Sequence, residues 1–157
     1  MDQPRETRRA FCAHTCRAVS LVALGGALST LLDGCASPLS PSNVGSLPTV
    51  NASVAGNSLL MTIDASSPLS TVGNAALVQS SLGFFLVARI SQTAFTALGA
   101  TCTHQTCTIT GFGSQKYVCP CHGSQFDTTG RVVLGPAPTS LPQYSTQFSN
   151  NVLTITV

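Results

Sequence analysis

Cys102-Thr103-His104-Gln105-Thr106-Cys107 and, further along, Cys119-Pro120-Cys121-His122-Gly123-Ser124 decide how this chain folds and what it can bind. Each stretch places one cysteine and one histidine close together, and each adds a second cysteine. Thiolates and imidazoles in two short clusters are typical of a metal site held by two loops. A structural zinc ion would need only four of these side chains, and a set of disulfides would leave the histidines without a role. The extra pair of cysteines needs an explanation beyond either alternative.

The two stretches resemble the sequence boxes of the Rieske family, C-T-H-x-x-C and C-P-C-H-G-S, and match both without a gap. In this family two thiolates and two imidazoles hold a 2Fe-2S cluster, and the histidines raise its potential. The extra cysteines point to the exported, disulfide-containing type found in cytochrome bc complexes. The resemblance implies ligation of the inner iron by Cys102 and Cys119, ligation of the outer iron by His104 and His122, a disulfide between Cys107 and Cys121, and a hydrogen bond from Ser124 to a cluster sulfur.

The resemblance also assigns a role to one further loop and one further residue. Gly135-Pro136-Ala137-Pro138 is similar to the proline loop that covers the cluster, and its two prolines restrict the backbone to a stiff conformation. Phe126 departs from the family pattern, because high-potential members carry a tyrosine here that donates a hydrogen bond to a ligating cysteine sulfur. One donor is then missing in this chain, which implies a lower potential.

From Thr49 onward the sequence predicts an all-β fold. Short runs of β-branched, apolar and aromatic residues alternate with Gly, Ser, Asn and Pro, and helical periodicity is lacking. We expect strands at residues 59–63, 75–79, 84–90, 95–98, 144–148 and 152–157. Asn150-Asn151 suits a tight hairpin turn, and a second hairpin is expected between residues 108–110 and 115–118, turning at 111–114. The resemblance implies an antiparallel β-sandwich base with an inserted cluster-binding subdomain at about residues 99–139.

The first 35 residues predict an export signal. Thr7-Arg8-Arg9-Ala10-Phe11 precedes an uncharged stretch, residues 18–32, and is similar to a twin-arginine signal. That route exports proteins already folded around their cofactors, which suits an iron-sulfur protein bound for the periplasm. A Sec leader with two arginines is the alternative. As a helix, residues 18–32 would span only about 22 Å of a hydrocarbon core of about 30 Å, so we do not expect them to be a retained anchor.

The end of this leader leaves two alternatives open. Leu32-Asp33-Gly34-Cys35 resembles a lipobox, in which Cys35 would be acylated and would anchor the protein to the membrane. Conventional cleavage after Ala36 would remove Cys35 instead. Residues 36–48 contain three prolines and four serines, which predicts a linker before a Rieske domain at residues 49–157.

The amino-acid composition narrows the range of possible functions. Charged residues make up 8% of the chain and the net charge is +2, so we expect neither nucleic-acid binding nor membrane binding other than through a lipid anchor. The chain has three histidines, too few for the additional iron site of a Rieske oxygenase, so we expect no catalytic centre of its own. We expect one-electron transfer, as an exported carrier or small redox subunit whose partner is a cytochrome or an oxidase subunit. The alternative is the Rieske subunit of a quinol-oxidising cytochrome bc complex, although Gln105-Thr106 stands where such subunits usually have Leu-Gly.

Overall fold

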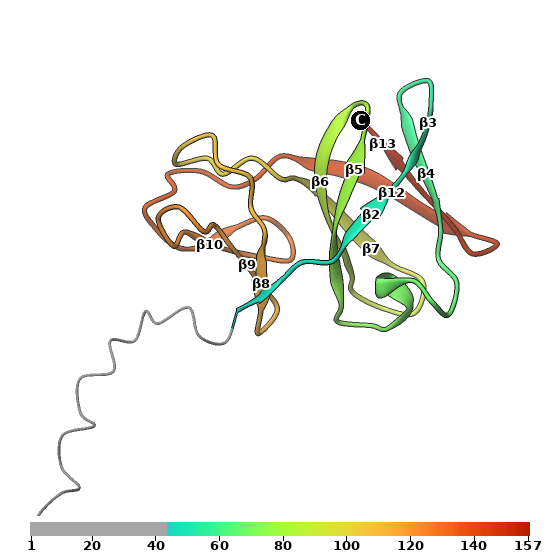
Figure 1. Cartoon of the computed structure of the whole chain (residues 1–157), viewed down its shortest axis with the longest axis horizontal. Coiled ribbons are helices and arrows are strands. Elements are labelled where there is room, and N and C mark those ends of the chain that lie inside the picture. The colour runs from blue at the N-terminus through green and yellow to red at the C-terminus, as the bar shows by residue number, and fades with distance from the viewer. Residues whose placement is uncertain (1–43) are drawn as a thin grey trace, which may run out of the picture. The chain divides into compact units, whose positions relative to one another are not determined.

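A computed structural model describes residues 44–157, and their regular secondary structure is almost entirely β (Figure 1). The predicted leader and Cys35 lie outside the described residues. No helix in this part of the chain is long and apolar enough to cross a membrane. The described elements are β1 Gly45–Ser46, β2 Thr49–Asn51, β3 Ser53–Ala55, β4 Ser58–Thr62, the short 3-10 helix η1 Pro68–Ser70, β5 Ala75–Ser80, β6 Gly83–Arg89, β7 Phe95–Gly99, β8 Gly111–Gly113, β9 Lys116–Val118, β10 Gln125–Asp127, β11 Val132–Leu134, β12 Gln143–Ser149 and β13 Val152–Thr156.

Within residues 44–157 the strands form two sheets. The larger has eight strands in the order β2-β5-β6-β7-β12-β13-β4-β3, and the smaller has five in the order β1-β8-β9-β10-β11. Pairing is antiparallel except between β2 and β5, which run parallel. Figure 1 places β8, β9 and β10 at one end of these residues and β3, β4 and β13 at the other. This is the predicted all-β arrangement of a base and a small inserted subdomain, and it is confirmed.

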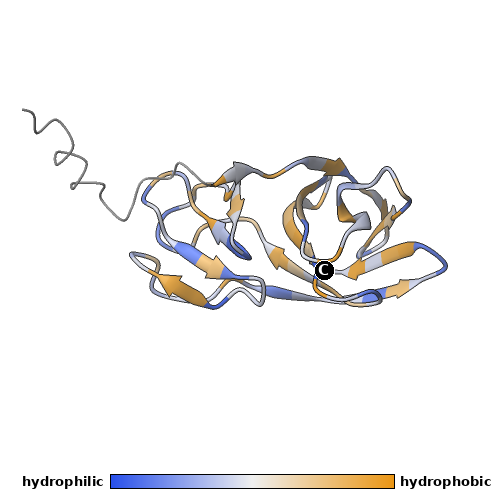
Figure 2. Ribbon diagram, turned by 90° about the horizontal axis from the view of Figure 1, so that it is seen from below, coloured by the Kyte–Doolittle hydropathy of each residue, from blue (hydrophilic) through white to orange (hydrophobic). Residues whose placement is uncertain are grey.

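The three strands β5, β6 and β7 form a wall that is buried on both faces. Successive residues of a strand point to opposite faces, and here the alternate residues belong to two separate hydrophobic cores. Hydrophobic segments accordingly lie along the strands (Figure 2). One face contributes Ala75, Leu77, Leu86, Ala88 and Leu98 to the core shared with the smaller sheet, and the other contributes Ala76, Val78, Phe85, Val87 and Ala97 to the core under β4 and β13.

The six strands predicted from apolar runs correspond to β4, β5, β6, β7, β12 and β13, with ends that differ by at most one residue. The predicted turn at Asn150 and Asn151 is also confirmed, because both residues have positive φ, 50° and 59°. Register across this turn pairs Ser149 with Val152. Side chains that prefer the left-handed region were therefore a reliable signal at this position.

The prediction for the second hairpin was wrong about its turn. The hairpin exists, but Gly111–Gly113 is strand β8, and the chain turns at Ser114 and Gln115, whose φ angles are 49° and 58°. Gly111 allows its neighbours to pack closely. A Cβ added to it would lie 2.7 Å from Val44 Cγ1 and 3.0 Å from the Val118 carbonyl oxygen. The glycines at 111 and 113 predicted a turn, but Gly111 is required by the close approach of its neighbours.

The prediction of a linker through Pro48 was also wrong for its last residues. Strand β1 pairs with β8 of the smaller sheet, and Leu47 is only 6% exposed. The Leu47 N–H donates to the Thr110 carbonyl at 2.7 Å, while the Pro48 carbonyl accepts from the Leu77 N–H at 2.9 Å. This segment therefore connects both sheets before β2 joins the larger one. Pairing through the backbone needs no side-chain pattern, so the composition of residues 36–48 did not reveal it.

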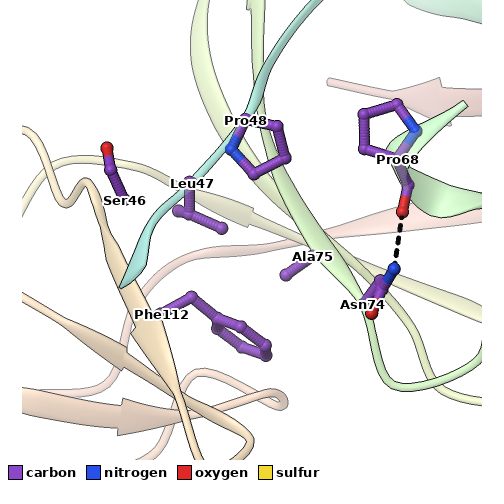
Figure 3. A pocket seen from close by; sticks show the side chains of 7 residues that line it. All are labelled: Ser46, Leu47, Pro48, Pro68, Asn74, Ala75 and Phe112. Carbon is purple, nitrogen blue, oxygen red and sulfur yellow. Dashed lines mark hydrogen bonds between the residues drawn. The ribbon is translucent and has the colours of Figure 1, made fainter. Parts of the chain in front are cut away.

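Leu47 and Pro48 border a small pocket between the two sheets (Figure 3). The pocket has a volume of about 240 Å³, and Phe112 of β8 and Ala75 of β5 lie on its other sides. The Asn74 side-chain amide donates to the Pro68 carbonyl at 3.1 Å, which fixes the loop that closes the pocket from the base. Leu47 thus belongs to the core shared by both sheets.

We expect Leu47→Ala to lower the free energy of unfolding by about 2 to 5 kcal/mol, because it removes a buried side chain and leaves a cavity. Denaturant titration of the exported domain measures this. Val54→Ala, at a position 38% exposed on β3, is the control and should change stability little. Equal stability of the two variants would mean that residues 44–48 behave as a linker after all.

Candidate metal centre

The two cysteine–histidine stretches form tight loops that extend from strands. Residues 119–124 are the turn between β9 and β10, where the Cys119 N–H donates to the Ser124 carbonyl at 2.9 Å and the Gly123 N–H donates to the Cys119 carbonyl at 3.0 Å. Gly123 has φ 72°, which favours glycine. Residues 102–107 follow β7, and the Cys102 N–H donates to the Cys107 carbonyl at 2.8 Å. Both loops are thus fixed by their own backbone.

These loops bring the predicted ligands together. The rings of His104 and His122 have centroids 4.8 Å apart and are nearly perpendicular, at 88°. Cys102 and Cys119 are 3% and 1% exposed, and no disulfide joins either of them. His122, by contrast, is an exposed residue. The arrangement therefore has a thiol side inside the protein and a histidine side that reaches its surface.

The chemistry of this donor set fits a 2Fe-2S cluster. Among the described residues, three buried side-chain atoms lack a hydrogen-bond partner, and His104 Nδ1 is one of them. A buried imidazole nitrogen without a partner is costly unless something else binds it. No three His, Cys, Asp or Glu side chains of residues 44–157 are grouped to hold one ion, but a two-iron cluster takes its protein ligands in pairs. Two buried thiols and two adjacent imidazoles provide those pairs.

A disulfide joins the two loops. Cys107 and Cys121 are bonded, with an S–S distance of 2.03 Å and Cα atoms 6.5 Å apart. The predicted pairing is therefore confirmed. Each cysteine is close in sequence to two of the candidate ligands, so the bond restrains the ligand pairs relative to each other.

The proline loop is attached to both ligand loops. The Ala137 N–H donates to Ser124 Oγ at 3.0 Å, and Thr103 Oγ1 donates to the Thr139 carbonyl at 2.6 Å. Ser124 is fully buried and uses its oxygen as the acceptor here, so its hydroxyl proton is still available to another acceptor. The bonds through Thr103 and Ala137 were missed from the sequence, because partners 36 and 13 positions apart leave no local signal. Gly135 and Pro136 are joined by a cis peptide bond.

Comparison with known proteins identifies the family. The Rieske [2Fe-2S] domain family matches residues 63–145, which are 83 of the 157 residues. The chain belongs to the Rieske family. The cofactor of this family is a 2Fe-2S cluster, and the donor set described above is suited to it.

The relatives of this Rieske chain include iron-sulfur subunits of cytochrome b6-f complexes. The cytochrome b6-f complex iron-sulfur subunit of Prochlorococcus marinus (strain NATL1A) is 48% identical over 86 residues, which cover 50% of this chain and 48% of the relative. The same subunit of Trichodesmium erythraeum (strain IMS101) is 50% identical over 60 residues, 38% of this chain and 34% of the relative. The chain thus spans about half, or less, of the length of these curated relatives.

Solved structures resemble it as well. The plasma membrane Rieske protein PetC3 from Synechocystis PCC 6803 is 34% identical, with a TM-score of 0.48, covering 53% of this chain and 86% of that protein. The ferredoxin of carbazole 1,9a-dioxygenase from Nocardioides aromaticivorans IC177 is 16% identical, with a TM-score of 0.50, covering 62% of this chain and 96% of the ferredoxin. The ferredoxin match shows a shared fold and nothing more.

The two free thiols of the Rieske site differ in acidity. Burial raises the pKa of the Cys119 thiol, and its hydrogen bond with Cys102 raises it further. Burial acts on Cys102 in the same direction, but hydrogen bonds together outweigh it and lower the Cys102 pKa; they come from the His104 backbone, the Cys119 thiol, the Gln105 backbone and the Ser124 side chain. Cys102 is therefore the thiol that loses its proton first, and thiolate is the form that binds iron.

Phe126, the position that departs from the family pattern, lies in the core that contains both free thiols. It is fully buried and pairs across β9 and β10 with Tyr117, which is also fully buried. Burial raises the pKa of Tyr117, and its hydroxyl lacks a hydrogen-bond partner within the described residues. Tyr117 was not among the predicted site residues. Its place two residues before Cys119, on the same side of the strand, was the signal that could have identified it.

We expect the double variant Cys107→Ser, Cys121→Ser to be about 3 kcal/mol less stable than the wild-type domain, because the bond closes a loop of about 15 residues. Denaturant titration measures the loss, and mass mapping of the wild type should find these two cysteines linked. Thr106→Ser with Thr108→Ser is the control, since it alters exposed residues beside Cys107 and leaves the bond. A free thiol at Cys107 in the exported protein would contradict the prediction.

Proposed function

We propose that this chain transfers single electrons through a Rieske 2Fe-2S cluster held by Cys102, Cys119, His104 and His122, as an exported carrier or small redox subunit. The observation that carries the proposal is the meeting of two imidazole rings, 4.8 Å apart, at the surface side of two buried thiols. Membership of the Rieske family supports it. Ser124 is proposed to donate a hydrogen bond to a cluster sulfur, and the loop formed by Gly135, Pro136, Ala137 and Pro138 is proposed to cover the site.

Each part of the site has a separate task in this proposal. When bound, the cluster can accept and release one electron, and its reduction potential depends on the type of ligand and on hydrogen bonds to sulfur. The buried thiolates of Cys102 and Cys119 hold it on the protein side. The exposed His122 gives the electron a short path to a partner. In His104 the buried Nδ1 has no hydrogen-bond partner, and it is the nitrogen proposed to bind iron. The other ring nitrogen, Nε2, is then left to carry a proton.

A second candidate is the Rieske subunit of a quinol-oxidising cytochrome bc or b6-f complex. The observation that favours it is the identity of 48% with a cytochrome b6-f complex iron-sulfur subunit over the matched region. Oxidoreductase activity would then belong to the complex, with quinol as the reductant and a cytochrome as the partner. In both candidates the chain itself carries the electron and performs no bond chemistry.

A spectrum of the purified protein tests the proposed function. Protein expressed with iron-sulfur assembly should be reddish, contain two irons per chain and give a Rieske-type EPR signal after reduction. His122→Ala should lose that signal, while Gln105→Ala, a neighbour of His104 that is not a proposed ligand, should retain it. A colourless wild-type protein containing zinc would overturn the assignment. Recovery in a membrane complex with haem would favour the second candidate.

We expect Phe126→Tyr to raise the midpoint potential by about 40 to 65 mV, if the new hydroxyl donates to a ligand sulfur with about 1 to 1.5 kcal/mol of preference for the reduced state. Ser124→Ala should lower it. Voltammetry at fixed pH measures both. The control is Phe148→Tyr, because this side chain packs against the core under β4 and β13, which contains neither Cys102 nor Cys119. An unchanged potential in folded Phe126→Tyr would mean that this side chain only fills the core.

We also propose that residues 1–35 direct export by the twin-arginine route and that Cys35 becomes a lipid anchor on the periplasmic side. The arginine pair, the uncharged stretch and the lipobox-like sequence support this. The Rieske domain follows, with its cluster-binding subdomain at about residues 99–139.

Changing Arg8 and Arg9 to lysine should trap the precursor in the cytoplasm, whereas Arg5→Lys with Arg17→Lys should leave export intact. Cell fractionation and immunoblotting measure this. Normal export of the first variant would indicate a Sec route. Labelling with a radioactive fatty acid should mark the wild type and not Cys35→Ala, and an unlabelled wild type would favour cleavage after Ala36.

A further inference from the structure

The base of the protein has two ends that differ in charge. Strand β6 runs from Gly83 at one end to Arg89 at the other, and β5, β7 and β12 run beside it. We call the first end the rim and define it as residues 80–85, 99–101 and 142–144. It includes the connection between β5 and β6, at the top of Figure 1, and the points where β7 ends and β12 begins.

The charged side chains of residues 44–157 lie away from the rim. They are Asp64, Arg89, Lys116, Asp127 and Arg131. The Arg89 guanidinium donates to the Leu69 and Ser70 carbonyls of η1. Asp64 accepts a hydrogen bond from the N–H of Ser67, the N-cap of the same short helix. Both charges of the base are therefore at its η1 end.

The three charges of the smaller sheet lie toward the same end. The Gln115 side-chain amide donates to the carbonyl of Gly73, in the loop between η1 and β5, and Lys116 follows directly. Asp127 is the cross-strand partner of Lys116 and accepts from the Arg131 N–H. The rim is thus the uncharged end of the described residues.

A groove with a volume of about 380 Å³ opens at the rim. Phe85 and Tyr144 belong to its lining, and their rings meet edge to face with centroids 5.2 Å apart. Gly99 contributes no side chain, and a Cβ added there would lie 3.5 Å from Pro142 Cδ. Cys102, one of the two buried thiols, is also part of the lining. The groove is mostly apolar and has room for a large side chain.

Two large apolar side chains of the rim stand beside this groove and are exposed. Leu82 and Phe84 are 42% and 46% exposed, and both border the groove. The tip that carries them is fixed, because Ser80 Oγ accepts from the Leu82 N–H at 3.1 Å and donates to the Gly83 carbonyl at 3.2 Å. A tip that is already ordered loses little conformational entropy when it binds. Exposed apolar side chains grouped beside an apolar groove mark an interaction surface.

The rim therefore carries a protrusion and a hollow side by side. A contact with two-fold symmetry uses the same patch on both molecules, so the protrusion of each copy can enter the hollow of the other. Such a contact also brings each patch against its own copy, where like charges would repel. The rim residues include no charge. Both properties suit a second copy of this chain as the occupant of the groove.

We propose that two copies of this chain associate through the rim, with Leu82 and Phe84 of each copy against the groove of the other. Cys102 belongs to the lining of the groove, so the thiol sides of the two metal centres would face each other. His122 would stay exposed, because it is not part of this lining. Electrons could then pass between the two copies. That consequence rests on the proposed electron transfer, whereas the association does not.

Sedimentation equilibrium of the exported full chain tests the inference. Every sample carries Cys35→Ala, so that neither a lipid nor a disulfide through Cys35 can join two chains. The mass should rise from that of one chain to that of two with increasing concentration, with a Kd on the order of 10 µM for a small interface. A protein that stays monomeric up to about twenty times that Kd would overturn the inference, whether or not its rim binds lipid vesicles or another protein.

Variants of the rim show where the contact lies. Leu82→Glu places a charge in the contact twice and should raise the Kd at least about tenfold, and Phe84→Ala should raise it in the same direction. The control is Val133→Glu on β11, at a position that is 48% exposed and outside the rim, and it should leave the Kd within about twofold. Mass mapping of the disulfide between Cys107 and Cys121 checks that each variant is folded.

Two results would contradict the assignment of the contact to the rim. One is a folded Leu82→Glu protein that still dimerises like the wild type, and the other is dissociation caused by Val133→Glu alone. Either would place the contact elsewhere and overturn the inference. A dimeric wild type without a Rieske EPR signal would instead overturn the proposed function and leave the association in place.

Discussion

Two loops separated in sequence must hold two imidazole rings in contact, and this constraint organises the rest of the fold. Neither loop has regular secondary structure, so each depends on what lies at its ends: the β9–β10 hairpin for one and the end of β7 for the other. The disulfide between Cys107 and Cys121 then fixes one loop against the other. A cluster that must change its charge without moving its ligands requires such restraint, because reorganisation would add to the barrier for electron transfer.

The buried half of the site is supported by the base of the protein. Cys102 and Cys119 belong to the same core as Leu86 and Leu98 of the central wall. A wall buried on both faces is stiff because its residues are packed on each side, and protein cores pack nearly as densely as crystals. The small sheet on its own has five short strands and would be a weak scaffold. The two thiols therefore owe their positions to strands that contain none of the candidate ligands.

Features that depend on residue chemistry could be predicted from the sequence. The turn at Asn150 and Asn151 follows from side chains with few alternative uses. The pairing of Cys107 with Cys121 was implied by the resemblance of the two stretches to the Rieske family. Features that depend on backbone pairing could not. Gly111 was ambiguous, because glycine serves turns and close approaches alike. The pairing of β1 was hidden because its hydrogen bonds come from main-chain groups, which every sequence possesses, and Leu47 alone carries the apolar signal.

The crossing of residues 45–51 from the smaller sheet to the larger limits how the domain could swing on an anchor. These residues are hydrogen-bonded to both sheets. The domain could therefore swing only about a point before Val44, and residues 45–51 cannot add to the length of the tether. Only eight residues, 36–43, separate Cys35 from that point, and a chain of that length spans at most about 29 Å. A domain anchored at Cys35 would thus sample only a thin layer above the lipid, with its first strand leading directly into the sheet that carries the second ligand loop.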